Sequence, residues 1–245
     1  MAARKPTNPI FVALDTPSLN DATNLAAKLA DHVGGLKLGL EFFSAHGPKG
    51  VQQIQKASEL PIFLDLKFHD IPNTVTSAVR AVCQLGVYMI NVHACGGRAM
   101  MEAAVKAADD TVHELAVPKP LIIAVTVLTS MDASDLNETG VPESPADQVL
   151  RLAALAKASG LDGVVCSPHE VAILKRELGT GFKLITPGVR PASAAANDQK
   201  RIMTPEEALQ AGSDFLVIGR PITGAADPAV AAARIAAEIR PFHAS

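Results

Sequence analysis

The sequence predicts an α/β protein that folds as a single-domain (β/α)8 TIM barrel. Short runs of β-branched and aliphatic residues recur along the 245-residue chain, and alanine- and leucine-rich segments with helical spacing separate them. There are eight such runs, and eight strand–helix units in about 250 residues are typical of a closed parallel barrel. The motif G-x-G-x-x-G is absent after the first run, which argues against an open dinucleotide-binding sheet.

The predicted elements follow one another without a linker, so we expect one domain over residues 1–245, with 1–9 as an N-terminal tail. The predicted strands are 10–15, 35–40, 62–68, 88–94, 121–128, 163–167, 183–188 and 215–219. The predicted helices are 19–31, 48–58, 73–85, 97–109, 146–159, 169–178, 205–211 and 228–240. Two long connections, 129–145 and 189–203, leave the C-terminal ends of strands, where barrel enzymes place their sites, and we expect them to act as lids.

The composition of the chain predicts a globular protein and excludes several classes of function. The chain is 48% hydrophobic and 19% charged, with a net charge of −3 and no basic stripe, so we expect a globular protein that does not bind nucleic acid. Cys83, Cys95 and Cys166 show no C-x-x-C spacing, which favours a reducing compartment without disulfides or a zinc knuckle. No apolar run approaches the ~20 residues that span a bilayer, and none resembles a signal peptide. These features predict a cytoplasmic protein with no membrane association.

The third predicted strand, "IFLDLKFHD", carries charge where a barrel core is expected. Alternation with period two places Asp65, Lys67 and His69 on the interior face, the first two roughly 6.6 Å apart along the strand. Lys37 in the second strand and Asp15 at the end of the first join them. Opposite charges offset the cost of burial, and the carboxylates should keep Lys67 as an ammonium. A structural ion network is the alternative, but a site for a charged substrate explains such costly groups better.

The turn that follows, "HDIPNT", contains Asp70, which breaks the alternation. Asp70 either caps the turn or the next helix, or extends sideways out of the barrel mouth. His69, His93 and His169 lack the H-x-H or H-x-x-x-H spacing that is typical of metal sites, so we predict no metal.

The segments "LITPGVRP" and "FLVIGRPIT" close the last two strands, where barrels commonly bind phosphate. Gly188 and Gly219 permit close approach of the backbone, and Arg190, Gln199 and Arg220 supply donors. The alternative for Arg220 is that it caps a helix or pairs with a surface acid.

These residues carry a family resemblance. "FLDLKFHDIPNTV" contains the signature D-x-K-x-x-D and resembles the bacterial type 1 orotidine 5′-phosphate decarboxylases, which perform the last step of UMP synthesis. "VALD", "LKLGLEFF", "NVHACGG", "AVTVLTSM", "SGLDGVVCS", "ITPGVRP", "DQKRIMTP" and "VIGRP" also resemble that family, in its order. The resemblance spans about residues 10–240.

The resemblance implies a cofactor-independent decarboxylase in pyrimidine biosynthesis that acts as a homodimer. Lys67 would protonate a C6 carbanion within a Lys37–Asp65–Lys67–Asp70 array whose Asp70 comes from the partner subunit. The ribose would be bound by Asp15, Lys37 and the partner's Asp70 and Thr74. Thr129 would contact the pyrimidine, and the phosphate would be held by Arg190, Gln199, Gly219 and Arg220.

Three alternatives remain at this point. A magnesium-dependent sugar-phosphate decarboxylase or epimerase on the same barrel shares the signature, but it has an acid where this chain has Lys37. An aldolase would use Lys67 as a Schiff-base nucleophile, which the nearby acids disfavour. A catalytically silent nucleotide-binding or scaffold protein is the third.

Overall fold

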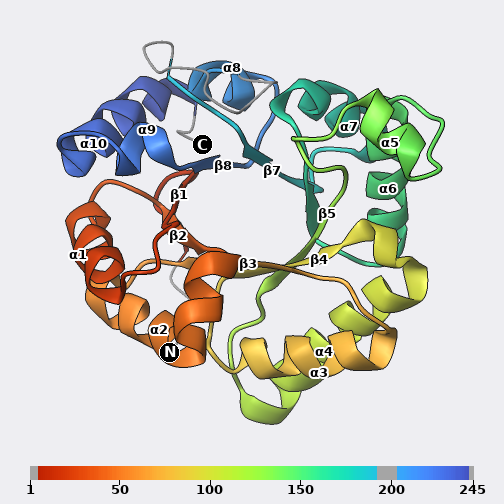
Figure 1. Cartoon of the computed structure of the whole chain (residues 1–245), viewed down its shortest axis with the longest axis horizontal. Helices are drawn as coiled ribbons and strands as arrows, with labels where there is room; N and C mark the ends of the chain where they lie inside the picture. Colours follow the sequence, from red (N-terminus) through yellow and green to blue (C-terminus); the bar gives the residue numbers. More distant parts are fainter. Residues whose placement is uncertain (1–4, 192–202, 243–245) are drawn as a thin grey trace.

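The computed structural model describes residues 5–191 and 203–242. Eight parallel strands form a closed barrel, and helices surround it on the outside (Figure 1). Each strand pairs with the next one in sequence, and β1 pairs with β8 to close the ring. This arrangement confirms the predicted single-domain (β/α)8 barrel.

The strands agree with the predicted ones in number and order, but most of them end earlier. They are β1 Ile10–Ala13, β2 Gly35–Leu38, β3 Ile62–Phe68, β4 Met89–His93, β5 Leu121–Val125, β6 Gly163–Val165, β7 Lys183–Pro187 and β8 Phe215–Ile218. The residues that follow each strand leave the sheet and form the loops around the C-terminal mouth of the barrel.

The helices cover the outer face of the barrel, with α3 and α4 next to each other along one side (Figure 1). They are α1 Leu19–Leu29, α2 Leu40–Ser58, α3 Pro72–Cys83, α4 Arg98–Leu115, α5 Ala133–Glu138, α6 Pro145–Ala158, α7 Val171–Leu178, α8 Pro205–Gln210, α9 Arg220–Thr223 and α10 Pro228–Ile239. Short 3-10 turns occupy Ala94–Gly96, Pro168–Glu170 and Arg240–Phe242. Across the described residues, none of these helices is long and apolar enough to cross a membrane.

Two of the differences from the sequence prediction have local reasons. The segment α2 consists of two helices that meet in a kink at Gly47, whose φ is 55°, directly before Pro48. The predicted helix 48–58 is the second of them, and the first, which begins at Leu40, was not predicted. The predicted loop 129–145 contains helix α5. Asp132 begins that helix, accepting hydrogen bonds from the backbone N–H groups of Ser134 and Asp135. Residues 192–202 of the other predicted lid lie outside the described residues.

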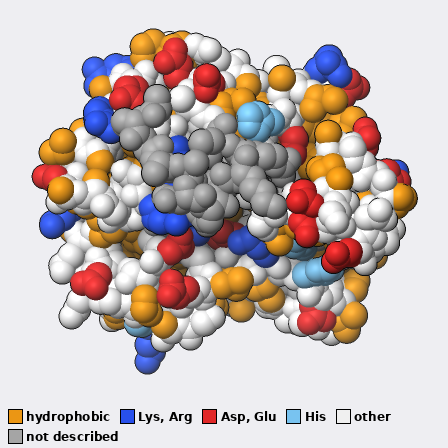
Figure 2. All heavy atoms as spheres, turned by 45° about the horizontal axis from the view of Figure 1, so that its top comes forward, with side chains coloured by type: hydrophobic (Ala, Val, Ile, Leu, Met, Phe, Trp, Pro, Cys, Tyr) orange, Lys and Arg blue, Asp and Glu red, His pale blue; other side chains and the backbone are white. Residues whose placement is uncertain are grey.

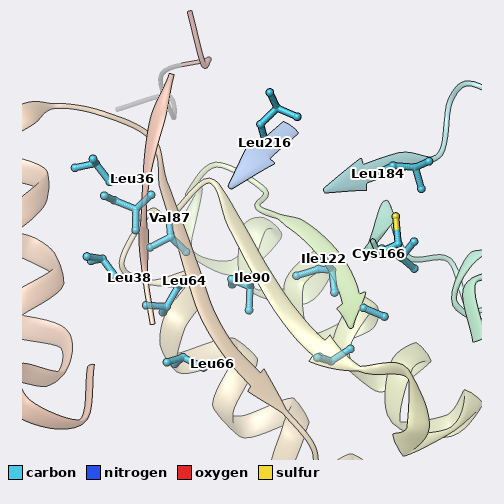
Figure 3. Close-up of a cluster of buried hydrophobic side chains, with 14 of the residues drawn as sticks. Leu36, Leu38, Leu64, Leu66, Val87, Ile90, Ile122, Cys166, Leu184 and Leu216 are labelled. Carbon is cyan, nitrogen blue, oxygen red and sulfur yellow. The ribbon is translucent and has the colours of Figure 1, made fainter. Parts of the chain in front are cut away.

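The larger core lies between the barrel and its helices. Leu64 and Leu66 of β3, Ile90 of β4 and Ile122 of β5 point outward into it, each less than 9% exposed (Figure 3). Burying one such side chain contributes about 1.5–3 kcal/mol, so this layer supplies most of the driving force for folding.

A smaller apolar cluster fills the interior of the barrel. Its buried members are Phe11, Ala13, Phe63, Met89, Ile123, Ile185 and Val217, which alternate with the outward-facing residues of the same strands. On β3, Phe63 belongs to this cluster, and Asp65 and Lys67 follow it on the interior face. The interior therefore changes from apolar to charged toward the C-terminal ends of the strands, which is where the site is expected.

Candidate active site

Four charged side chains meet at the C-terminal mouth of the barrel. Nζ of Lys37 lies 3.3 Å from Oδ1 of Asp15 and 3.3 Å from Oδ2 of Asp65. Nζ of Lys67 donates a hydrogen bond of 2.6 Å to the other oxygen of Asp65, Oδ1. The structure thus brings together four residues singled out from the sequence. Figure 2 shows basic and acidic side chains next to one another near the centre of this face.

Asp65 is the buried centre of this array. Its side chain is 13% exposed, against 10% for Lys37 and 31% for Lys67. Burial alone would raise the pKa of Asp65, but the ammonium groups of Lys37 and Lys67 and hydrogen bonds from Lys67 and Asn91 outweigh it and lower the pKa below its usual value. Asp15, which is 60% exposed, adds little to the stability of the array.

Strand β3 reaches this geometry through a bulge. Leu64 pairs with Ile90 of β4 and Phe68 pairs with Val92, so three residues of β3 lie opposite the single residue Asn91. Lys67, the third of the three, has a φ of 51°, in the left-handed region that side-chain-bearing residues rarely adopt. Regular alternation therefore predicts the correct face for Asp65 and Lys67 but not the backbone that presents them.

Asn91 is a site residue that sequence reasoning missed. Its Oδ1 accepts the backbone N–H of Lys67 at 2.7 Å, and its Nδ2 donates to Oδ1 of Asp65 at 2.7 Å. Asn91 is fully buried on β4, with its side chain toward the interior. The available signal was the polar residue within the apolar run "YMINVHA", which a strand facing only a core would not contain.

Two adjoining cavities open beside the array. One, of about 200 Å³, is bordered by Lys37, Asp65 and Lys67 on one side. Its other walls are mainly apolar and come from several strands: Phe63, Val125, Val127, Leu128, Thr129, Val165, Pro187 and Val217. This cavity fits a flat, largely apolar group held against two ammonium groups.

The second cavity, of about 190 Å³, shares Lys37, Pro187 and Val217 with the first. It extends between β7 and β8 and is bordered by Gly188, Arg190, Gly219 and Arg220. Gly188 has a φ of 78°, which explains glycine there. Two guanidinium-bearing residues and Lys37 make this cavity suitable for an anion. Gln199, the other predicted donor, lies outside the described residues.

Asp70 and Thr74 lie apart from the array, on the outer rim. Both are exposed, and Oδ1 of Asp70 accepts the backbone N–H of Ile71 at 2.6 Å. Asp70 borders an open hollow together with Ile71, which is 66% exposed. Among the described residues, the ion pair that Lys67 forms is the one with Asp65. Within one chain the predicted array therefore ends at Lys67.

His69 and His93 stack beside the site, with ring centroids 5.4 Å apart. Burial, and then the charges of His69 and Lys67, lower the pKa of His93. In the part of the chain that the structure describes, no three His, Cys, Asp or Glu side chains are grouped so that they could hold a metal ion.

The sequence of this chain resembles those of known proteins over nearly its whole length. The model of the family described as "Orotidine 5'-phosphate decarboxylase / HUMPS family" matches residues 8–235, nearly the whole chain. The chain belongs to this family. The resemblance carried by D-x-K-x-x-D and the other segments is thereby confirmed, as is the family's barrel fold.

Individual members of the orotidine 5′-phosphate decarboxylase / HUMPS family are similar over their full length. A protein named orotidine 5′-phosphate decarboxylase from Rhodospirillum rubrum is 60% identical over 237 residues, covering 97% of this chain and 96% of that protein. One of the same name from Paramagnetospirillum magneticum is 51% identical, covering 95% and 98%. The crystal structure of orotidine 5′-phosphate decarboxylase from Lactobacillus acidophilus has a TM-score of 0.84 at 38% identity, covering 95% of this chain and 99% of that one.

Proposed function

We propose that this protein decarboxylates orotidine 5′-phosphate to UMP and carbon dioxide, the last step of UMP synthesis in pyrimidine biosynthesis, without metal or cofactor. The observation that carries the proposal is the ammonium group of Lys67, held 2.6 Å from Asp65 at the edge of an apolar cavity. The names of relatives that are 51–60% identical over nearly the whole chain support the choice of substrate.

The two cavities accommodate the two ends of such a substrate. The pyrimidine enters the apolar cavity, where Thr129 supplies a polar contact and Lys67 approaches C6. The ribose lies at the junction beside Lys37 and Asp15. The phosphate occupies the second cavity, which Arg190, Gly219 and Arg220 border; Gln199, the further donor that the family resemblance implies, lies outside the described residues. Lys37 borders both cavities, so its position at the junction matches that of the ribose hydroxyl groups.

Decarboxylation at C6 requires a positive charge close to that carbon atom. When the bond between C6 and the carboxylate breaks, the electron pair stays on C6 in the plane of the ring, where the π system does not delocalise it. Carbon dioxide leaves, and the ammonium of Lys67 stabilises the carbanion before transferring a proton to C6. The lysine then regains a proton from solvent. Asp65, ionised because its pKa is lowered, fixes the ammonium in place before the reaction begins.

A second subunit completes the site in this proposal. Asp70 and Thr74 are exposed on the rim, with the exposed Ile71 beside Asp70, so they are accessible to another copy of the chain. In a two-fold homodimer each chain would contribute Asp70 and Thr74 to the partner's site, next to Lys67. Asp70 would place a second carboxylate near the ammonium.

Mixing two inactive variants tests this shared site. Lys67→Ala and Asp70→Ala chains, dissociated and reassembled together, should recover about a quarter of wild-type activity, because half of the dimers are hybrids with one intact site. If Asp70 acted on its own chain, the mixture would stay inactive. Each variant reassembled alone is the control.

The proposed function also implies the domain organisation, the cellular location and the partners of the protein. One catalytic domain spans residues 1–245, with 1–9 as a tail. The protein acts in the cytoplasm on a free nucleotide, with neither nucleic acid nor membrane as a partner. The three free cysteines, two of them buried, support a reducing compartment.

The experiment is a decarboxylation assay with EDTA-treated protein. The loss of ultraviolet absorbance of orotidine 5′-phosphate is followed, and UMP and carbon dioxide are identified as products. Turnover that is unchanged by EDTA supports the proposal. No turnover by a folded dimer, with activity appearing on sugar phosphates after addition of magnesium, would replace it with the metal-dependent alternative.

A further inference from the structure

The backbone at Lys67 needs a specific support. Lys67 ends a bulge in which Asp65, Leu66 and Lys67 lie opposite the single residue Asn91, and its φ of 51° is unfavourable for a side chain with a Cβ atom. In the regular part of β3 the backbone groups of successive residues point alternately to β2 and to β4, as the carbonyls of Pro61 and Ile62 do. At the bulge the backbone N–H of Lys67 points to β4 and donates to the side-chain carbonyl of Asn91, at 2.7 Å.

The other end of the same amide acts on the Lys67 side chain through Asp65. Nδ2 of Asn91 donates to Oδ1 of Asp65 at 2.7 Å, and that oxygen also accepts the hydrogen bond from Nζ of Lys67 at 2.6 Å. Asn91, Asp65 and Lys67 therefore form a closed ring of three hydrogen bonds. One fully buried side chain fixes both the backbone and the ammonium position of the same lysine.

The ring requires a side chain with an acceptor and a donor at this spacing. Asparagine provides both on a short, stiff side chain, whereas aspartate provides two acceptors when it is ionised and alanine provides neither. Among the described residues, Asp65 and Lys67 hydrogen-bond Asn91, Lys37 of β2 pairs with Asp65, and His93 lies two residues along β4. The neighbouring β5, whose Ile123 pairs with Asn91, contributes no charged or titratable group.

We propose that Asn91 is a positioning residue for catalysis: it holds Lys67 in its left-handed backbone conformation and orients Asp65, and so sets where the ammonium meets C6. The inference rests on the proposed decarboxylation. Asn91 borders neither of the two cavities, so its effect is on the chemical step and not on binding.

The first variant is Asn91→Ala. Misplacing a catalytic group by about 1 Å costs on the order of 100-fold in rate, so we expect kcat to fall about 100-fold and KM to change less than about threefold. The matched control is Thr186→Val on β7, which removes a buried polar group that hydrogen-bonds Ser213 on the outer side of the barrel. Its kcat should stay close to that of the wild type. A kcat within about threefold of wild type in folded Asn91→Ala would overturn the proposal.

Asn91→Asp provides a readout that a merely structural role would not change. The new carboxyl group stands in the place of Nδ2, 2.7 Å from Oδ1 of Asp65, and two carboxyl groups so close share one proton. While that proton is present, the ring of hydrogen bonds is intact. We expect the ratio of variant to wild-type kcat to be highest in acid and to fall as the pH rises. A ratio independent of pH would overturn the proposal.

Hydrogen exchange separates this inference from the proposed function. The amide of Lys67, followed by NMR after ¹⁵N-lysine labelling, should exchange slowly in the wild-type protein and much faster in Asn91→Asp at high pH. This measurement needs no substrate, so it tests the ring even if the wild-type protein does not decarboxylate orotidine 5′-phosphate. Fast exchange of the Lys67 amide in the wild-type protein would refute the role of Asn91 even if both variants failed to fold.

Discussion

The replacement Asp65→Asn tests the electrostatics of the array most sharply. It keeps the shape of the side chain but removes the negative charge that lies 3.3 Å from Nζ of Lys37 and 2.6 Å from Nζ of Lys67. With an effective dielectric constant of about 20, these separations correspond to attractions of about 5 and about 6 kcal/mol before desolvation is subtracted. Removing one partner of a buried charge pair typically costs about 3–5 kcal/mol, because the remaining charges stay buried and uncompensated. We expect that loss in the free energy of unfolding at neutral pH.

The loss should depend on pH in one direction. The pKa of Asp65 is lower in the folded protein than in the unfolded chain, so the carboxylate stabilises the fold fully above the ordinary aspartate pKa of about 3.9. That stabilisation disappears as the pH falls through the lowered pKa of the folded state. The difference between wild type and Asp65→Asn should therefore be constant near neutrality and shrink in acid.

Urea unfolding at a series of pH values measures this difference. The matched control is Asp110→Asn, because the pKa of Asp110 is also lowered, mainly by a hydrogen bond from Lys106, but at the surface of α4. Its effect on stability should be small at every pH. A difference below about 1 kcal/mol for Asp65→Asn at neutral pH, or one that grows in acid, would refute the electrostatic reasoning.

Two further substitutions test the substrate-facing residues. Arg220→Ala should lower kcat/KM by several orders of magnitude, because this arginine at the second cavity would hold the phosphate. The melting temperature should stay unchanged, because the arginine is exposed and contributes little to packing. A loss in kcat/KM of less than about tenfold would contradict the prediction. Gly39→Ala adds a methyl group 3.1 Å from Nζ of Lys37, so we expect KM to rise without loss of the fold, since the backbone at Gly39 is not left-handed. An unchanged KM would show that Lys37 does not bind the ribose.

Much of the fold was predictable because the barrel repeats one pattern. Each strand corresponds to a short apolar run in the sequence. The interior location of Asp65 and Lys67 follows because side chains along β3 point alternately into the barrel and toward the helices. The break that Gly47 and Pro48 indicate is present as the kink in α2, and what the prediction missed is the helix that precedes it.

The parts of the site that escaped prediction depend on contacts between strands. The bulge at Lys67 exists because β4 offers one residue opposite three, and a single strand read alone does not reveal its neighbour's register. Asn91 is an uncharged residue in a largely apolar run, so no charge singled it out in the sequence. The proposed role of Asp70 and Thr74 depends on a second chain, so neither the sequence pattern nor the geometry of one chain places them next to Lys67.

The central claim is that the ammonium of Lys67 stabilises and protonates the C6 carbanion. The most direct measurement is turnover of orotidine 5′-phosphate in D₂O by wild-type protein, Lys67→Ala and the surface control Lys106→Ala. The account predicts UMP with deuterium at C6 from the wild type and the control, and at least about a 1,000-fold loss of turnover in Lys67→Ala that is still folded and binds UMP. Substantial turnover by folded Lys67→Ala would contradict it and assign the proton to another donor.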